Sequence, residues 1–334
     1  MKISVFLQHI VPLCALLCFV SACSENADAP PLPTEPAAAE TVPSTPVPDT
    51  AEEAVEVEED DPFEEFEVES DDEMPPPVVD AKGGIRIDAT ARLPKYLAEY
   101  NLFKDPANQV PNTGLIPYYL NTGHFSDNAA VMRFIWLPPG KRATFHPIGR
   151  FTFPPGTALI QTFSYSQKED PAKMRLVETR VLLNQPGKGW NLSSYKWDAT
   201  GTSARKAVAG GLVPVSYVSA ANEARDFDYL IPNKNDCKRC HENEEVVFAL
   251  GLTARNLNRD VDYGAGTENQ LAHWIKQGLL DGVPEDLSAV EKGPEWSDPA
   301  TGSVTERARM WLDVNCAHCH NPKGAGSVSG LDLS

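Results

Sequence analysis

Between residues 83 and 230, apolar and polar positions alternate with the two-residue period of a β-strand. In the run at 177–183, Val, Thr, Val and Leu fall on one face, while Glu178 and Arg180 fall on the other. Similar runs, and the proline- and glycine-rich turns that bound them, lie at residues 131–137, 138–140, 154–156, 157–165 and 186–187. The pattern predicts a β-rich domain over residues 83–230, folded as a sandwich or barrel.

After residue 230 the apolar positions recur at helical spacing. Thr267 and Gln270 form a capping box, and the residues that follow it build one apolar face: Leu271, Trp274, Ile275 and Leu279. A second capping box, Ser303 with Glu306, begins another helix. We therefore expect an α-helical region in the last third of the chain, and a multidomain α+β fold overall.

The segment before residue 83 has a different composition. Residues 24–81 contain 20 Asp or Glu, no Lys or Arg, and repeated prolines. Low hydrophobicity and like charge give such a segment little with which to build a core, so residues 23–82 are predicted to be a disordered acidic tether. The chain carries a net charge of −18; Lys2 and the tether account for −19, which leaves residues 82–334 at +1. The folded part is therefore nearly neutral.

Residues 1–22 have the features of an export signal. Lys2 precedes an apolar stretch that ends in Val20-Ser21-Ala22, and Cys23 follows directly. Small residues before a cysteine resemble a bacterial lipobox, which predicts cleavage before Cys23 and lipidation of that residue; an ordinary signal peptide cut near Ala22 is the alternative. Ser24 resembles the residue found in lipoproteins sent to the outer membrane. We expect a protein of the bacterial cell envelope, anchored on the periplasmic side.

Two copies of Cys-x-x-Cys-His carry the chemistry. They are Cys237-Lys-Arg-Cys240-His241 and Cys316-Ala-His-Cys319-His320. This is the attachment sequence of haem c: residues i and i+3 of a helical turn share a face, so two thiols can meet one edge of a porphyrin, and the next residue supplies an iron ligand. Two covalent haems are therefore expected, with thioethers at the four cysteines and proximal ligands at His241 and His320.

The cysteine count agrees with that assignment. Of the seven cysteines, Cys14 and Cys18 leave with the signal, Cys23 takes lipid, and the other four belong to haem. The alternative is a zinc site built from the same four thiols, Cys237, Cys240, Cys316 and Cys319, because paired Cys-x-x-Cys sequences also bind zinc.

The distal ligands are less determined by the sequence. Met310 and His273 are the two candidates for the first haem, at 69 and 32 residues beyond His241. Each also has a structural interpretation: Met310 as a core residue of an amphipathic helix, and His273 as a residue exposed to solvent. His124 and His146 fall in predicted loops and are interpreted as surface or hydrogen-bonded residues. Only 14 residues follow His320, none of them Met or His, so we expect the chain to be a fragment with an incomplete second haem region.

Several short motifs, in this order, resemble a family of bacterial diheme c-type cytochromes with a β-rich N-terminal half. The resemblance covers residues 110–334 and implies two covalent haems, a redox role and a C-terminal part that continues further. The motifs are His124–Asp127, Phe153–Thr157, Glu178–Arg180, Pro232–His241, Ala254–Arg259, Asn269–Leu271, Gly278–Leu280 and Arg307–His320. The helical signals and the 79-residue spacing of the two Cys-x-x-Cys-His motifs predict a cytochrome c-like helical region, with a first haem region at residues 231–300 and a second, incomplete one at 301–334.

The leading functional hypothesis is electron transfer between a partner oxidoreductase, a dehydrogenase or another cytochrome, and the respiratory chain. A second hypothesis is a diheme peroxidase-like enzyme with one haem open to substrate. A third is a ligand-binding lipoprotein whose thiols hold zinc. No feature of the sequence points to a nucleic-acid partner.

Overall fold

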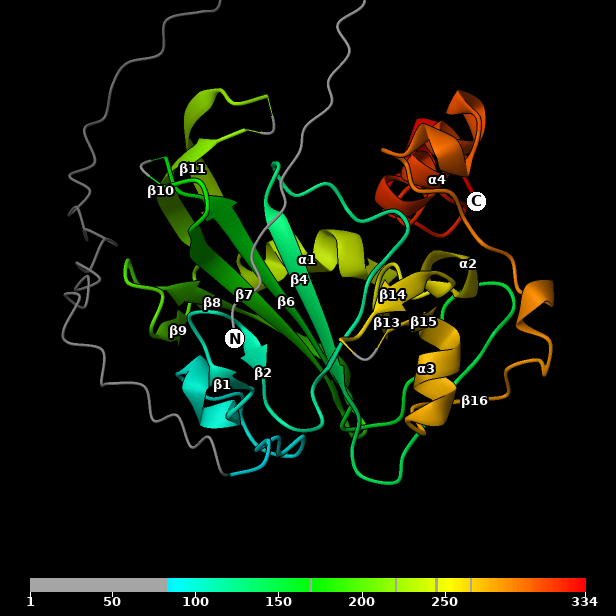
Figure 1. Cartoon of the computed structure of the whole chain (residues 1–334), viewed down its shortest axis with the longest axis horizontal. Coiled ribbons are helices and arrows are strands. Elements are labelled where there is room, and N and C mark those ends of the chain that lie inside the picture. Colours follow the sequence, from blue (N-terminus) through cyan, green and yellow to red (C-terminus); the bar gives the residue numbers. More distant parts are fainter. Residues whose placement is uncertain (1–82, 169, 220, 244–245, 265) are drawn as a thin grey trace, which may run out of the picture. The chain divides into compact units, whose positions relative to one another are not determined.

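The computed structural model describes residues 83–334, apart from residues 169, 220, 244–245 and 265 (Figure 1). These residues belong to one structural unit. The predicted signal peptide, the lipidation site at Cys23 and the acidic tether lie outside the described residues. Within the described part, no helix is long and apolar enough to cross a membrane.

A six-stranded antiparallel sheet lies at the centre of this unit (Figure 1). In spatial order the strands are β3 (Ile116–Pro117), β4 (Ala130–Trp136), β6 (Ala158–Ser166), β7 (Met174–Gln185), β8 (Gly189–Trp197) and β9 (Ala204–Lys206). The runs predicted at 131–137, 157–165 and 177–183 lie in three of its neighbouring strands, β4, β6 and β7. Gly156, with φ +94°, makes the turn into one of them; a Cβ there would lie 2.6 Å from Pro138 Cγ.

The other described strands pair only in twos, so they do not make the second sheet of a sandwich or close a barrel. Four of these pairs are antiparallel, and the pair of β5 with β16 is parallel. They are β1 (Phe103–Asp105) with β2 (Val110–Pro111), β10 (Gly211–Val218) with β11 (Ala224–Ile231), β12 (Glu242–Asn243) with β13 (Val246–Val247), β14 (Asp260–Asp262) with β15 (Thr267–Asn269), and β5 (Ala143–Thr144) with β16 (Leu280–Asp281).

The predicted α-helical, cytochrome c-like region is wrong: the described chain is β-rich, and its helices are few and short. Glycines and prolines interrupt residues 231–300, and two strand pairs lie between the helices. The α-helices are α1 (Lys234–His241), α2 (Ala254–Leu257), α3 (Gln270–Lys276) and α4 (Val304–Asn315); the 3₁₀ turns are η1 (Leu97–Tyr100), η2 (Leu287–Ala289), η3 (Pro299–Thr301) and η4 (Ser327–Ser329).

The capping residues explain where the helices begin. Ser303 and Glu306 form the predicted capping box of α4, with Ser303 Oγ accepting from the Glu306 amide. The helix predicted from Thr267 starts later, because Thr267 belongs to β15 and the side chain of Asn269 caps α3. Asn233 caps α1, accepting hydrogen bonds from two backbone amides of its first turn.

Both faces of the central sheet are buried, each by a different part of the chain. On β7, Val181 and Leu183 belong to the core shared with residues 93–115. Leu182 points to the opposite face and belongs to a core shared with residues 249–290. The apolar face of α3 therefore packs against the sheet instead of against other helices. Trp274, fully buried, meets the ring of Tyr118 edge-on, with 6.1 Å between ring centroids.

Polar contacts join the same two parts. The fully buried Gln270 donates to the carbonyls of Tyr119 and Leu257, and its Oε1 accepts from the Tyr119 amide. The core thus runs continuously from the strands into the segment that follows the first Cys-x-x-Cys-His motif.

We predict that Trp274→Ala lowers the free energy of unfolding by about 3–5 kcal/mol, because it removes a large side chain from a closed core. Trp296→Ala is the matched control: Trp296 is 50% exposed, and its loss should change stability by no more than about 0.5 kcal/mol. Denaturant titration of both variants measures the difference. Equal effects would show that α3 does not share the core of the sheet.

Candidate functional site

The first motif forms the C-terminal half of helix α1, and its two thiols differ in their exposure to solvent. Cys237 is half-buried and packs against the core that contains α3, while Cys240, one turn later, is exposed. Burial raises the pKa of the Cys237 thiol, and the nearby Arg180 charge opposes that shift. No disulfide joins the four described cysteines.

The imidazole of His241 is fixed through one nitrogen. Its Nδ1 lies 2.9 Å from the carbonyl oxygen of Phe248, a pairing in which Nδ1–H donates and Nε2 carries the free lone pair. Burial lowers the pKa of His241 to about 4, and the charges of Arg180 and His318 add to the shift, against the effect of the Phe248 bond. The ring is therefore neutral near pH 7, the form in which histidine ligates a metal.

A cavity of about 320 Å³ opens beside this motif. Its size lies within the usual range for ligand sites, about 300–1,000 Å³. One wall is the sheet face that carries Leu159, Leu182 and Leu192. The opposite side presents the three reactive residues of the first motif: Cys237, Cys240 and His241.

A second imidazole, that of His124, lines the same cavity. It lies between β3 and β4, and its Nε2 is shielded from solvent without a hydrogen-bond partner among the described residues. Burial lowers the pKa of His124 to about 3, with smaller contributions from the charges of His318 and Arg133. The sequence interpretation of His124 as a surface or hydrogen-bonded residue does not describe this position.

Asp236 and two arginines are the charged residues among those that line the cavity, and only one of the arginines has a carboxylate partner in the described part of the chain. Arg180 makes two 2.9 Å hydrogen bonds to the carboxylate of Glu178, which is fully buried and also accepts from Tyr229 at 2.6 Å. Arg133 has no carboxylate partner in the described part of the chain; one of its nitrogens reaches the Val131 carbonyl at 3.4 Å, and its shielded Nε is unpaired. A buried guanidinium of this kind attracts an anionic group.

The second motif follows helix α4 and is more open. The Nδ1 of His320 lies 3.1 Å from the hydroxyl of Ser329, so this imidazole is also fixed through Nδ1. The chain wraps closely around the motif: a Cβ on Gly324 would lie 2.1 Å from the Cys319 carbonyl oxygen, and one on Gly326 would lie 2.9 Å from His320 Nδ1. Only glycine fits at these two positions.

The two motifs adjoin each other. The thiols of Cys240 and Cys319 and the ring of His318 place their ligand atoms within 4.8 Å of one another, and Cys319 Sγ lies 3.4 Å from the Arg239 carbonyl oxygen. Burial raises the pKa of Cys319, and the neighbouring Cys240 raises it further. Cys237 and Cys316, the other two members of the predicted four-thiol zinc site, are not part of this group.

The predicted distal candidates are not among the described residues that line the cavity. His273 is buried, stacks on Tyr263 with 3.7 Å between ring centroids, and bonds the Glu268 carboxylate through Nδ1 at 2.5 Å. Its predicted exposure to solvent therefore differs from its position in the structure. Met310 is also buried, with its thioether packed next to Gly293.

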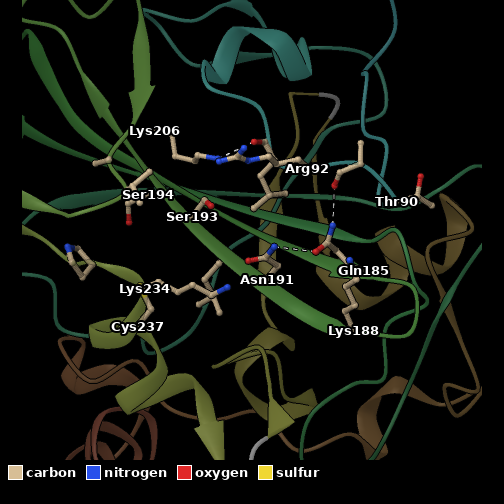
Figure 2. Close-up of a pocket in the computed structure, with 16 residues that line it drawn as sticks. Thr90, Arg92, Gln185, Lys188, Asn191, Ser193, Ser194, Lys206, Lys234 and Cys237 are labelled. Atoms are coloured by element: carbon tan, nitrogen blue, oxygen red, sulfur yellow. Dashed lines mark hydrogen bonds between the residues drawn. The ribbon is translucent and has the colours of Figure 1, made fainter. Parts of the chain in front are cut away.

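A larger cavity of about 420 Å³ adjoins the first, and Cys237, Ser193 and Ser194 line both (Figure 2). Figure 2 shows side chains from β8 and from the start of α1 meeting there. No histidine or carboxylate is among its lining residues, but four basic ones are: Arg92, Lys188, Lys206 and Lys234. The cavity that contains His124 is therefore the one that pairs the first motif with a second imidazole.

Comparisons with protein families, with curated proteins and with solved structures found no match. The residues of the site are therefore interpreted from their geometry alone.

Sequence reasoning identified the motif residues and missed three others that share the site. His124 is one, although it begins one of the short motifs that carry the family resemblance. Arg133 is another, hidden within a strand pattern. The third is His318, which lies inside the second motif but has no place in the attachment sequence itself. Each of the three has a side chain that can bind a metal or an anion and lies in or near one of the motifs found in the sequence. Only the fold, however, brings them together.

We predict that Glu178→Ala destabilises the protein by about 3–5 kcal/mol, because it leaves the Arg180 charge inside the structure without its partner. Tyr229→Phe removes one hydrogen bond to the same carboxylate and should cost about 1.5–3 kcal/mol. The double variant Glu178→Leu, Arg180→Met should recover much of the stability lost in Glu178→Ala. Denaturant unfolding of the three variants tests the ranking, and a neutral effect of Glu178→Ala would contradict it.

Proposed function

We propose that this protein is a membrane-anchored diheme c-type cytochrome that transfers electrons between a partner oxidoreductase and the respiratory chain. The observation that carries the proposal is the way both motif histidines are held. His241 and His320 each engage Nδ1 with a neighbouring oxygen, the carbonyl of Phe248 and the hydroxyl of Ser329. Each ring therefore keeps Nε2 for a metal. The Phe248 carbonyl, which can only accept, fixes the tautomer of His241, and the Ser329 hydroxyl orients the ring of His320.

The residues of the first cavity fit a haem. Cys237 and Cys240 provide the thioether bonds, His241 ligates the iron, and the leucines of the sheet provide an apolar wall. Arg133, which has no carboxylate partner among the described residues and whose shielded Nε makes no hydrogen bond there, is the natural partner for a propionate carboxylate. A bound haem supplies a reversible one-electron couple at its iron. At the second motif, Cys316, Cys319 and His320 take the corresponding roles.

The contact between the motifs supports electron exchange between the two sites. Cys240 and Cys319 bring their sulfur atoms together although the motifs begin 79 residues apart, at positions 237 and 316. Attachment at these thiols would hold the two cofactors at one junction, so no rearrangement of the chain would be needed for an electron to pass between them.

Location and partner form part of the same proposal. An export signal and lipidation at Cys23, which lies outside the described residues, would place the folded part in the periplasm of a bacterial cell envelope, where haem c is attached. The acidic tether would separate it from the bilayer. The partner is a redox protein, and encounters of this kind use small interfaces.

We predict that the full chain, exported in a host with c-type maturation, carries two covalent haems, and that Cys237→Ser with Cys240→Ser removes one of them. Haem staining of the denatured protein and a pyridine haemochrome assay measure the ratio of haem to chain. The matched control is Cys316→Ser with Cys319→Ser, which should also leave one haem. Wild-type protein without covalent haem would reject the proposal.

A zinc-holding protein is the second candidate, favoured by the group formed by Cys240, His318 and Cys319. Two thiolates and an imidazole make a plausible zinc ligand set. Metal analysis separates the candidates. Zinc at this group requires stoichiometric metal that His318→Ala releases, whereas covalent haem at the four cysteines should survive His318→Ala.

We predict that Arg133→Met lowers the reduction potential of the first haem. A nearby positive charge favours the reduced state, because reduction lowers the net charge at the iron, so its removal favours the oxidised state. Arg175→Met is the control, since Arg175 bonds the Pro214 carbonyl and is not among the residues that line the cavity. Potentiometric titration measures both variants, and an unchanged or raised potential in Arg133→Met would exclude this role.

A further inference from the structure

We infer that His124 is the distal ligand of the iron held by His241, so that the first haem is coordinated by two histidines from opposite halves of the described chain. The inference rests on the proposed haem at the first motif. It assigns a ligand to a residue of the loop between β3 and β4, which lies more than a hundred residues before Cys237 in the sequence.

The first argument is the state of the imidazole itself. His124 Nε2 is shielded from solvent and makes no hydrogen bond with any described residue, although the ring lines the cavity into which Cys237, Cys240 and His241 project. A buried polar nitrogen without a partner is costly and calls for an explanation. Coordination of a metal in the cavity supplies the missing partner.

The second argument is the rigidity of the loop that carries it. The fully buried side chain of Asn256 makes two hydrogen bonds with the backbone of Thr122. Its Oδ1 accepts from the Thr122 amide at 2.8 Å, and its Nδ2 donates to the Thr122 carbonyl at 3.0 Å. Thr122 Oγ1 also donates to the Pro294 carbonyl at 3.0 Å. Asn121 adds further bonds to residues 255–258.

The loop is held on its other side as well. The amide of Phe125 donates to Asn315 Oδ1 at 2.7 Å, at the end of helix α4 and directly before the second motif. A Cβ on Gly251 would lie 3.3 Å from His124 Cε1, so the segment after the first motif packs closely on the ring. His124 is thus bracketed by both haem-binding segments, and such preorganisation is what a metal ligand needs.

The competing residues are engaged elsewhere. His273 is bonded to Glu268 and stacked on Tyr263, and Met310 packs next to Gly293. His318 is the closest competitor, because it lines the same cavity and its Nδ1 is unpaired. The rings of His318 and His124 meet edge-on, with 6.1 Å between their centroids. The ligand atom of His318, however, lies within 4.8 Å of the Cys240 and Cys319 thiols, where the porphyrin edge would be attached, whereas His124 is not part of that group.

The test uses the exported full chain with Cys316→Ser and Cys319→Ser, so that only the first haem is attached. His124→Ala is compared with His146→Ala, a matched control whose half-buried ring bonds Thr152 and does not line the cavity. Optical and electron paramagnetic resonance spectra report the iron's spin state, and haem content is measured on the same samples. We expect complete conversion from low spin to high spin in His124→Ala, reversed by added imidazole, and no change in His146→Ala.

Haem bound at full occupancy and still low-spin in His124→Ala would overturn the inference and leave the proposed function intact. So would conversion in His318→Ala without conversion in His124→Ala. Wild-type chain without haem would instead remove the proposed function, and the inference with it. If His124→Ala does not accumulate, His124→Met provides the test. If residue 124 ligates the iron, this variant should show the methionine–iron charge-transfer band and a raised reduction potential. A bis-histidine spectrum in this variant would reject the assignment.

Discussion

The architecture of the site depends on one buried contact, the pair of hydrogen bonds between Asn256 and the backbone of Thr122. It joins the loop before β4 to the segment after the first motif, two parts that are 134 residues apart. Gln270 makes a similar pair of hydrogen bonds with the backbone of Tyr119. Buried amides are specific partners, because a shift in register leaves them unsatisfied at a cost of about 1–3 kcal/mol each. They therefore fix where the motif lies against the sheet.

The sheet gives the cavity a wall of low polarity, and in such a setting every charge must be matched. Glu178 matches Arg180 within the protein itself, with Tyr229 holding the second carboxylate oxygen. Among the described residues, Arg133 has no carboxylate partner and His124 Nε2 has no hydrogen-bond partner. The two unsatisfied groups have different chemistry: one attracts an anion and the other a metal. A metal porphyrin with carboxylate side groups would satisfy both at once, and for this reason the proposed haem accounts for the cavity better than zinc would.

Part of the fold and of the site could be predicted from local sequence patterns. The thiol spacing and the following histidine are a local pattern, and the alternation of residues 177–183 places β7. The predicted helical region was wrong because the spacing of apolar residues in α3 indicates a helix with one buried face but not what covers that face. In the structure this face packs against the sheet. His124 was missed for a related reason: its ring packs next to Gly251, and the next residue, Phe125, is held by Asn315, and no local pattern encodes either contact.

A site assembled in this way couples cofactor binding to folding of the whole described unit. The thiols and His241 lie on one short segment, so attachment needs only local order there. The opposite side, with Arg133 on β4 and His124 in the loop before it, exists only when the sheet and the C-terminal segment have packed together. Completing the coordination would then stabilise the packed state over any partly folded one, because a ligand that binds only the native form shifts the equilibrium toward it. If the proposed haem is bound there, the sheet would form part of the site as well as its scaffold.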